Sequence, residues 1–386
     1  MISVETIDSL KQVDPLDWDR VASRHVFACH GLLSTMEDTS LTYHPRYYLA
    51  RDTWGITAVA PCYLGYSQRD VDGLDQLLFG RLSKLPPMLR LSVAPTLVCG
   101  PRFGITSNVL IDPNRNSEDH RRITEKVIDA MVEDARNNSW TLCFTNVIDK
   151  STPLSETLRA RRFGRALDLP AMVLNLRWKS FDDYLRGLRD MHPSTVKGIK
   201  WERRRARKVG LDVLPDWDPS TDLRVAHKLL DDHYRRLNGA PFPYHQKFLE
   251  TLLRRMGNKL VFYTAVHANT LLGVAVGFRG EGSIALSMLG VVQPASRAKA
   301  VYFNTCYNQP IEDAIANGIE RLFMGKLLYD VKARRGLEML PLHVYVRFPS
   351  RLRQSLVQPA FSYQVRILTA RHRHLPVVQE DLRRAP

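Results

Sequence analysis

Two groups of cationic side chains have a spacing that suits chemistry on anionic or ester substrates. The first lies in the segment KGIKWERRRARKVG, from Lys197 to Gly210. Its apolar residues recur every three or four positions, which predicts a helix over residues 194–209 with one packed face. The other face carries six cations that we predict to bind a nucleic acid, namely Lys197, Lys200, Arg203, Arg204, Arg207 and Lys208.

This row of charges has two interpretations. A rise of 1.5 Å per residue makes the row about 10–15 Å long, which suits several phosphates along a backbone better than one small ligand. Glu202 is the single acid within the run, so little in the helix offsets the repulsion between its cations. We therefore favour phosphate binding, with an ordinary solvated basic face as the alternative.

The second group follows a predicted strand, IERLFMG, in the segment KLLYDVKARRG. Ligands of α/β proteins often bind at strand ends. Transfer of an acyl group from an ester to an amine needs a donor for the developing oxyanion and a route for the proton of the amine. A lysine or a backbone N–H can serve the oxyanion, and a tyrosine, histidine or carboxylate can relay the proton. Ordinary surface charge is the alternative interpretation.

Other chemistries find no support in the residue spacing. The five cysteines are isolated and form no CxxC pair, which argues against a disulfide framework and against a zinc site. No Ser-His-Asp or Cys-His arrangement has a meaningful spacing. We therefore expect direct transfer without a covalent enzyme intermediate, and no metal ion.

The length, the net charge and the polarity of the whole chain indicate in what kind of protein these groups lie. Its 386 residues suggest two or three domains, and its net charge of +15 favours anionic partners. No apolar run reaches the roughly 18 residues that a transmembrane helix needs, and the N-terminus is too polar for a secretory signal, so we expect a cytoplasmic protein.

The expected elements repeat one order in the two halves of the chain. Each half reads as helix, strands, helix and strand, with a boundary in residues 150–170. Residues 117–138 form a clear amphipathic helix by their apolar spacing, and residues 259–292 read as a three-strand meander with turns at HANT and RGEG. Residues 300–318 read as a helix interrupted near Pro310. The tail after Pro349 gives no strong signal.

Residues 300–341 carry a recognisable series of motifs. They contain an aromatic pair, a Cys-Tyr-x-Gln run, a helix that ends in glycine, then a lysine and an Arg-Gly pair that lead to proline. The residues concerned are Tyr302, Phe303, Cys306, Tyr307, Gln309, Gly318, Lys332, Arg335, Gly336 and Pro341. This series resembles the GNAT-fold acyltransferases of the FemABX-like group, and more closely their branch for peptidoglycan biosynthesis or recognition. The resemblance spans about residues 20–348.

The resemblance implies a fold, and together with the cluster after the predicted strand and the helical side shared by Asn304 and Tyr307 it gives a set of candidate site residues. The fold would be α/β (α+β), with tandem GNAT-like domains whose mixed, mainly antiparallel sheets are flanked by helices. The domains would cover residues 1–160 and 161–348, followed by a basic extension at 349–386. Catalytic residues would be Lys332, Tyr329 and His233. Substrate-binding residues would be Lys326, Arg335, Tyr234, Asn304 and Tyr307.

The chain departs from the family at one place that bears on its substrate. The family usually reads Gly-Ala-Gln-Gly-Glu-His-Lys where this chain has GKLLYDVK. In this respect it looks closer to the aminoacyl-tRNA-dependent transferases of antibiotic pathways. The implied reaction is transfer from aminoacyl-tRNA to a small-molecule or peptide acceptor, with no further cofactor.

Two alternatives stay open. An acyl-CoA N-acyltransferase would use a CoA thioester as donor, but the expected phosphate-binding loop is GVVQPASRAKAVYFN, which has no glycine after Gly290. A non-catalytic nucleic-acid-binding module on the same scaffold is the second alternative. RNA or CoA that copurifies with the protein would discriminate among these hypotheses.

Overall fold

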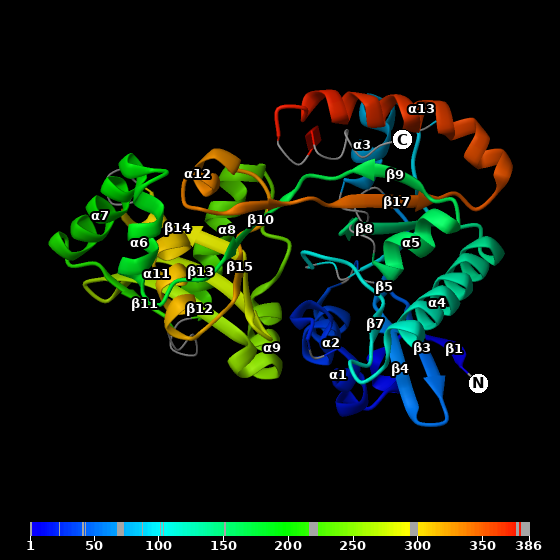
Figure 1. Ribbon diagram of the computed structural model, residues 1–386, viewed down its shortest axis with the longest axis horizontal. Helices are drawn as coiled ribbons and strands as arrows, with labels where there is room; N and C mark the ends of the chain where they lie inside the picture. Colours follow the sequence, from blue (N-terminus) through cyan, green and yellow to red (C-terminus); the bar gives the residue numbers. More distant parts are fainter. Residues whose placement is uncertain are drawn as a thin grey trace. The chain divides into compact units, whose positions relative to one another are not determined.

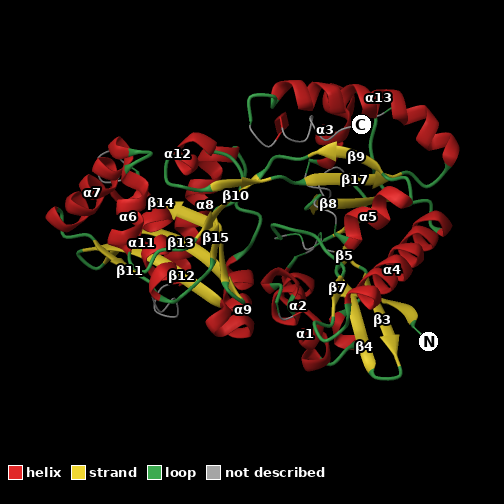
Figure 2. Cartoon of the chain, viewed as in Figure 1, coloured by secondary structure: helices red, strands yellow, loops and turns green. Residues whose placement is uncertain are grey.

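The computed structural model divides the chain into two compact units. One unit comprises residues 1–170 and 340–386, and the other comprises residues 171–339. The structure describes residues 2–22, 24–40, 42, 44–67, 73–86, 88–100, 102, 104–149, 152–215, 223–293, 300–375 and 378–379. Figure 1 traces the chain through both units, and Figure 2 separates helices from strands.

The first unit contains two sheets. One has the strand order β1-β3-β4-β7 and the other β2-β5-β6-β8-β17-β9. The strands are β1 (Ser3–Ile7), β2 (His44–Pro45), β3 (Tyr47–Asp52), β4 (Gly55–Ala60), β5 (Cys62–Gly65), β6 (Thr96–Cys99), β7 (Leu110–Ile111), β8 (Thr141–Val147), β9 (Gly164–Leu167) and β17 (His343–Arg347). The helices are α1 (Pro15–Ala22), α2 (His30–Thr39), α3 (Leu74–Phe79), α4 (Ser117–Asn137), α5 (Pro153–Ala160) and α13 (Arg351–Arg371), with short 3-10 turns at Leu10–Gln12, Val26–Ala28 and Gly80–Lys84.

The second unit is built on one seven-stranded sheet, with the order β11-β12-β13-β14-β15-β10-β16. Its strands are β10 (Ala171–Asn175), β11 (Asp212–Leu214), β12 (Leu260–His267), β13 (Thr270–Gly280), β14 (Ser283–Val291), β15 (Arg321–Phe323) and β16 (Glu338–Leu340). Its helices are α6 (Phe181–Arg189), α7 (Pro193–Lys208), α8 (Leu223–Asn238), α9 (Gln246–Met256), the π-helix η6 (Asn304–Asn308), α11 (Gln309–Ala316) and α12 (Tyr329–Ala333), with a 3-10 turn at Gly257–Lys259.

Local sequence signals explain most of these elements. In α4, Ile123, Val127, Ile128 and Met131 lie on one face and are buried, as their spacing predicts. Asn116 caps this helix by accepting a hydrogen bond from the backbone N–H of Asp119. The three-strand meander is confirmed as β12, β13 and β14, which pair antiparallel in sequence. The expected α/β architecture with mixed, mainly antiparallel sheets is therefore confirmed.

The predicted domain boundaries differ from those of the structure. The sequence placed them at residues 160 and 348, with a separate extension after 348. In the structure β17 lies between β8 and β9 of the first unit and pairs antiparallel with both, so the chain returns to this unit near residue 340. The extension also belongs to this unit, because α13 packs on α3 and β9.

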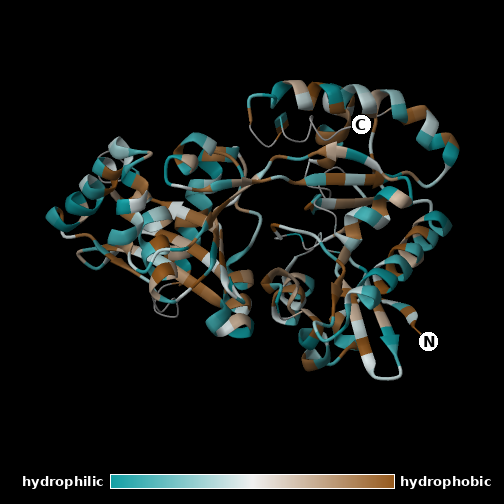
Figure 3. Cartoon of the chain, in the orientation of Figure 1, coloured by the Kyte–Doolittle hydropathy of each residue, from teal (hydrophilic) through white to brown (hydrophobic). Residues whose placement is uncertain are grey.

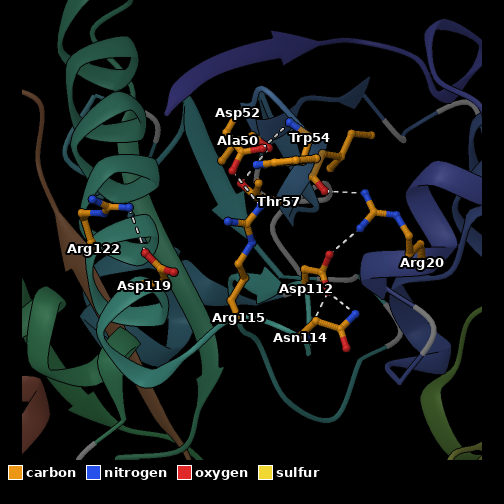
Figure 4. Close-up of polar contacts among 11 residues, drawn as sticks. Arg20, Ala50, Asp52, Trp54, Thr57, Asp112, Asn114, Arg115, Asp119 and Arg122 are labelled. Carbon is orange, nitrogen blue, oxygen red and sulfur yellow. Dashed lines mark hydrogen bonds and ion pairs between the residues drawn. The ribbon is translucent and has the colours of Figure 1, made fainter. Parts of the chain in front are cut away.

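Two ion pairs connect the β1-β3-β4-β7 sheet to α1 and to the segment before α4. Arg20, on α1, forms an ion pair with Asp112 and donates to the carbonyl oxygen of Ile56 at 2.7 Å. Arg115 donates to the carboxylate of Asp52 at 2.7 Å. Figure 4 shows these groups converging between α1, the β3–β4 hairpin and the segment that leads into α4. Their partners all lie within the fold, so we assign them to structural support.

Candidate functional site

The candidate site begins where two parallel strands separate. β14 and β15 pair only from Ser283 to Ala285 and from Arg321 to Phe323. Beyond that point β14 continues alongside β13, while the chain after β15 stays with β10 through hydrogen bonds between Met172 and residues 324 and 325. A pocket of about 340 Å³ opens between the two diverging segments.

A β-bulge shapes one wall of this pocket. Val276 pairs with Met288 and Gly277 with Leu286, so Ser287 is an extra residue in β14. Such bulges bend a strand and redirect its side chains, and they are frequent beside active sites. Ser287 is exposed and lines the pocket. Sequence reasoning missed Ser287, because the register of a strand pair does not follow from one sequence.

Lys332 is held at the floor of the pocket by three carbonyl groups. Its side chain is buried, and its Nζ donates to the carbonyl oxygens of Met324 at 2.6 Å, Lys326 at 3.0 Å and Gly325 at 3.4 Å. Burial lowers the pKa of Lys332 from 10.5 to about 8. An amine with this pKa changes its charge close to neutral pH, as residues at catalytic sites often do.

The loop after β15 brings the three carbonyl groups together. Gly325, Leu327 and Leu328 all have positive φ angles, of 67°, 68° and 54°. The left-handed region is unfavourable for leucine, so the surrounding fold has to impose this turn. Leu327 and Leu328 are also more than half exposed, and Leu328 lines the pocket. Strained residues of this kind concentrate at functional sites.

The π-helix η6 supplies the opposite wall. Cys306 and Tyr307 from η6 line the pocket together with Tyr302 from the preceding turn. The sequence predicted an interruption near Pro310, and the structure shows it as a π-helical turn just before α11. Burial raises the pKa of the Cys306 thiol, so the thiol stays protonated at neutral pH.

Arg335 lies behind this wall, in an ion pair with Glu202 of α7. Its Nη2 donates to the Glu202 carboxylate at 2.8 and 3.0 Å, and its Nη1 donates to Asn308 at 3.1 Å. The guanidinium lies over the rings of Phe303 and Tyr307, at 4.7 and 4.9 Å from their centroids. Both charged groups are buried. This geometry favours a structural role for Arg335, which joins the basic helix to the pocket wall.

The other predicted residues separate into two sets. Lys326 and Tyr307 line the pocket, and Tyr329 begins α12, the helix that carries Lys332. Asn304 is buried behind the pocket, where its side-chain amide donates to the carbonyl oxygens of Glu202 and Ala300. These four residues therefore lie on the same side of the second unit's sheet as Lys332.

His233 and Tyr234 lie on the other side of the sheet. A Cβ on Gly290 would meet the backbone of Leu229 in α8, whereas a Cβ on Gly273 would meet Val301 beside η6. Gly290 pairs with Val274 of β13, and paired residues point to the same face of a sheet. Gly273 precedes Val274, and consecutive residues of a strand point to opposite faces, so Gly273 and Gly290 face opposite sides. The structure therefore does not bring His233 to the pocket. Arg236 donates to its Nδ1 at 2.7 Å, and burial and this arginine lower its pKa.

The basic helix forms as its sequence predicts. Val196, Ile199 and Ala206 are buried on one face of α7, together with Glu202. Lys197, Lys200, Arg204, Arg207 and Lys208 are exposed on the other. Arg203 is half-buried, in an ion pair with Glu312 at 2.9 Å and above the ring of Phe181. Beside α7 lies a second pocket of about 520 Å³, lined by Lys200, Arg203, Arg204, Arg207, Glu312 and residues of α6.

In the first unit, the position that corresponds to this pocket, beyond the ends of two parallel strands, is filled by the chain itself. β6 and β8 also run parallel and pair from Thr96 to Cys99 and from Thr141 to Phe144. Beyond them, Ser107 donates from its backbone to Asn146 at 3.1 Å and from its hydroxyl to Cys99 at 3.2 Å. A Cβ on Gly100 would lie 1.9 Å from the Ser107 hydroxyl, so this closure needs glycine. We therefore place the candidate site in the second unit.

Sequence comparison identifies the family. The profile of the FemAB-like family, described as peptidoglycan biosynthesis/recognition, matches residues 9–359. The chain belongs to the FemAB-like family. No curated protein matches it in a sequence comparison.

Solved structures of similar shape agree with this family. FemX matches with a TM-score of 0.57 at 10% identity, over 92% of this chain and 99% of its own. The C-terminal domain of a putative lysylphosphatidylglycerol synthetase from Agrobacterium fabrum matches with a TM-score of 0.55 at 10% identity, over 90% and 95%. L-PGS from Bacillus licheniformis matches with a TM-score of 0.52 at 10% identity, over 87% and 95%.

These likenesses confirm the expected fold of tandem GNAT-like domains. Membership of the FemAB-like family further makes the chain a transferase of the general acyl or aminoacyl kind. Within the residues that the structure describes, no helix is long and apolar enough to cross a membrane.

Proposed function

We propose that this FemAB-like chain transfers an aminoacyl group directly from aminoacyl-tRNA to a small-molecule or peptide acceptor, in secondary-metabolite biosynthesis such as that of an antibiotic. The observation that carries the proposal is the exposed cationic face of α7. Five of the seven cations of α7 are exposed, and no exposed acid within α7 offsets them. The one acid of the helix, Glu202, faces inward and pairs with Arg335.

A long anion suits this surface better than a small one. The exposed cations extend over three turns of α7. Four cations of this helix, Lys200, Arg203, Arg204 and Arg207, also line the adjoining pocket of about 520 Å³, together with the acids Asp182 and Glu312. Phosphates spaced along a nucleic-acid backbone can contact such a row together, and each contact releases bound counterions. The ion pair between Glu202 and Arg335 joins this helix to the wall of the pocket that contains Lys332.

The pocket supplies what transfer from an ester requires. An aminoacyl ester is already activated, so the enzyme has to orient the two reactants and stabilise the developing negative charge. Lys332, whose pKa is lowered to about 8, is the residue that we assign to charge stabilisation. Its contact with the carbonyl oxygen of Gly325 is long, at 3.4 Å, so this N–H is the one that we assign to the oxyanion. Tyr329 and Lys326 are the neighbouring groups that we assign to proton relay and to binding of the substrate. The protonated thiol of Cys306 supports direct transfer without a thioester.

One observation favours a second candidate, an acyl-CoA-dependent N-acyltransferase. The pocket lies where β14 and β15 diverge, so an extended thioester arm could lie along the open edge of β14. The segment that would bind the CoA phosphates includes residues 294–299, which lie outside the described residues. RNA or CoA carried through purification discriminates between the two donors.

The decisive experiment compares two variants with equal loss of charge. The first replaces Lys197, Lys200, Arg204 and Arg207 by Gln and leaves Arg203 with its partners. The control replaces four exposed cations elsewhere, Arg121, Lys126, Lys247 and Arg254. Binding of tRNA to the first variant should weaken, and the slope of log K against log salt should flatten by about 0.7–0.9 for each phosphate that the variant no longer binds. Equal affinities and slopes for both variants would refute a role of α7 in tRNA binding.

A further inference from the structure

Helix α13 is apolar on two opposite sides. Its inner side buries Val357, Phe361 and Leu368, and Phe361 lies 3.0 Å from the position of a Cβ on Gly164 in β9. On the outer side, Leu352 and Leu356 are each 72% exposed and Tyr363 is 65% exposed. Taking about 100° per residue, the three outer side chains lie within an arc of roughly 40°. A helix with a second apolar side of this kind needs a second partner.

Charge borders the outer apolar stripe on both sides. The helix contains Arg351, Arg353, Arg366 and Arg371 and has no aspartate or glutamate. At about 100° per residue, the exposed Arg351 and Arg366 lie on one side of the stripe and the exposed Arg371 lies on the other. Arg353 is half-buried and donates to the carbonyl oxygens of Ser92 and Ala94. Figure 3 shows the resulting alternation of hydrophilic and hydrophobic residues along α13. An exposed apolar stripe bordered by arginines suits the interface of a membrane, where apolar side chains enter and cations stay at the headgroups.

A cavity opens beside the C-terminal half of the same helix. It has a volume of about 750 Å³ and lies wholly within the first unit. Its walls are mainly apolar, with Leu77, Leu82, Leu167, Leu169, Tyr363 and Ile367 among them. Arg81, Lys84 and Arg371 also line it, against one carboxylate, that of Asp168. Tyr363 belongs both to this cavity and to the outer stripe, so the two surfaces are continuous.

We propose that the outward side of α13, with this cavity, is a docking surface for an anionic lipid bilayer. Leucine and tyrosine side chains would enter the interface while the arginines contact anionic headgroups, and the cavity could receive an acyl chain. A second copy of the chain fits less well, because two such helices would bring their arginines together. A nucleic acid fits less well too, because exposed leucines offer nothing to phosphates.

The test is co-sedimentation of the full chain with vesicles. One set contains phosphatidylcholine alone and the other includes about 30% phosphatidylglycerol as the anionic lipid. Binding should require the anionic lipid and should weaken with salt. Leu352→Ser with Leu356→Ser should weaken binding at least about ten-fold. Arg351→Gln with Arg366→Gln should weaken it by about five-fold per arginine, roughly 25-fold in all.

The matched control places two serines at exposed leucines outside α13. Leu16 is 80% exposed in α1 and Leu237 is 67% exposed in α8. The double variant Leu16→Ser with Leu237→Ser should bind vesicles as the unchanged protein does. Equal binding by the control and both α13 variants would overturn the proposal. So would a dimer in sedimentation velocity that Leu352→Ser with Leu356→Ser abolishes while no variant binds vesicles, because the stripe would then be a contact between two copies.

Discussion

Replacement of Lys332 by methionine should separate turnover from stability. Methionine keeps an unbranched apolar side chain and removes the amine that donates to the carbonyl groups of residues 324–326. Loss of one charged donor to a transition state typically costs about 10²–10³ in rate. We expect a fall in single-turnover rate of that size with aminoacyl-tRNA and the true acceptor.

The free energy of unfolding should change less than the bonds alone suggest, because two effects oppose each other. The lowered pKa, from 10.5 to about 8, means that the folded protein disfavours the charged amine by about 3 kcal/mol, a cost that methionine removes. Each hydrogen bond from a charged donor contributes about 1.5–3 kcal/mol, and methionine loses two of ordinary length, at 2.6 and 3.0 Å, and a longer one at 3.4 Å. The net result should therefore be a loss of up to about 3 kcal/mol in urea denaturation.

The pH profile shows whether the charge itself is used. Below about pH 8 the amine of Lys332 is protonated and above it the amine is neutral. If the cation stabilises the oxyanion, the single-turnover rate should fall as the pH rises through about 8, and Lys332→Met should lose this dependence. Lys247→Met, at an exposed position of α9, is the control. A normal rate for Lys332→Met, or a rate that rises through pH 8, would refute the role given to this residue.

Two further predictions concern the groups around the pocket. Glu202→Gln leaves the buried Arg335 without its charged partner, so the free energy of unfolding should fall by about 3–5 kcal/mol in urea, whereas Glu312→Gln, which breaks the more exposed pair with Arg203, should cost about 1 kcal/mol or less. Similar losses of unfolding free energy for the two variants would show that burial does not make the Glu202–Arg335 pair more important for stability than the more exposed one. Cys306→Ala should keep most of the single-turnover activity because burial keeps the thiol protonated, and a trapped thioester at Cys306 would contradict direct transfer.

Much of the fold could be predicted because its signals are local. The apolar spacing of α4 and of α7, and the turns between β12, β13 and β14, each lie within one short stretch of sequence. Helix α13 could not be predicted in this way. It contains Pro359, and the apolar residues on both of its sides cancel the one-sided periodicity that marks an ordinary surface helix.

The candidate site could be predicted only in part, because its geometry depends on contacts that are distant in sequence. The segment around Lys332 was visible as cations after a strand. The pairing of Arg335 with Glu202 joins residues 133 positions apart, and the bulge at Ser287 depends on the register with β13. Histidine is a suitable residue type for proton transfer, so His233 was a reasonable candidate. The sequence of α8 alone does not show on which face of the sheet this helix packs.

The place of β17 has a consequence for the order in which a ribosome can complete the two units. Every strand of the second unit's sheet is synthesised before β17, whereas the first unit still lacks a strand that lies between β8 and β9. Until residues 343–347 emerge, β8 has an open edge and β9 lacks the strand with which it pairs. The second unit can therefore finish folding first during translation, although most of the first unit precedes it in the chain.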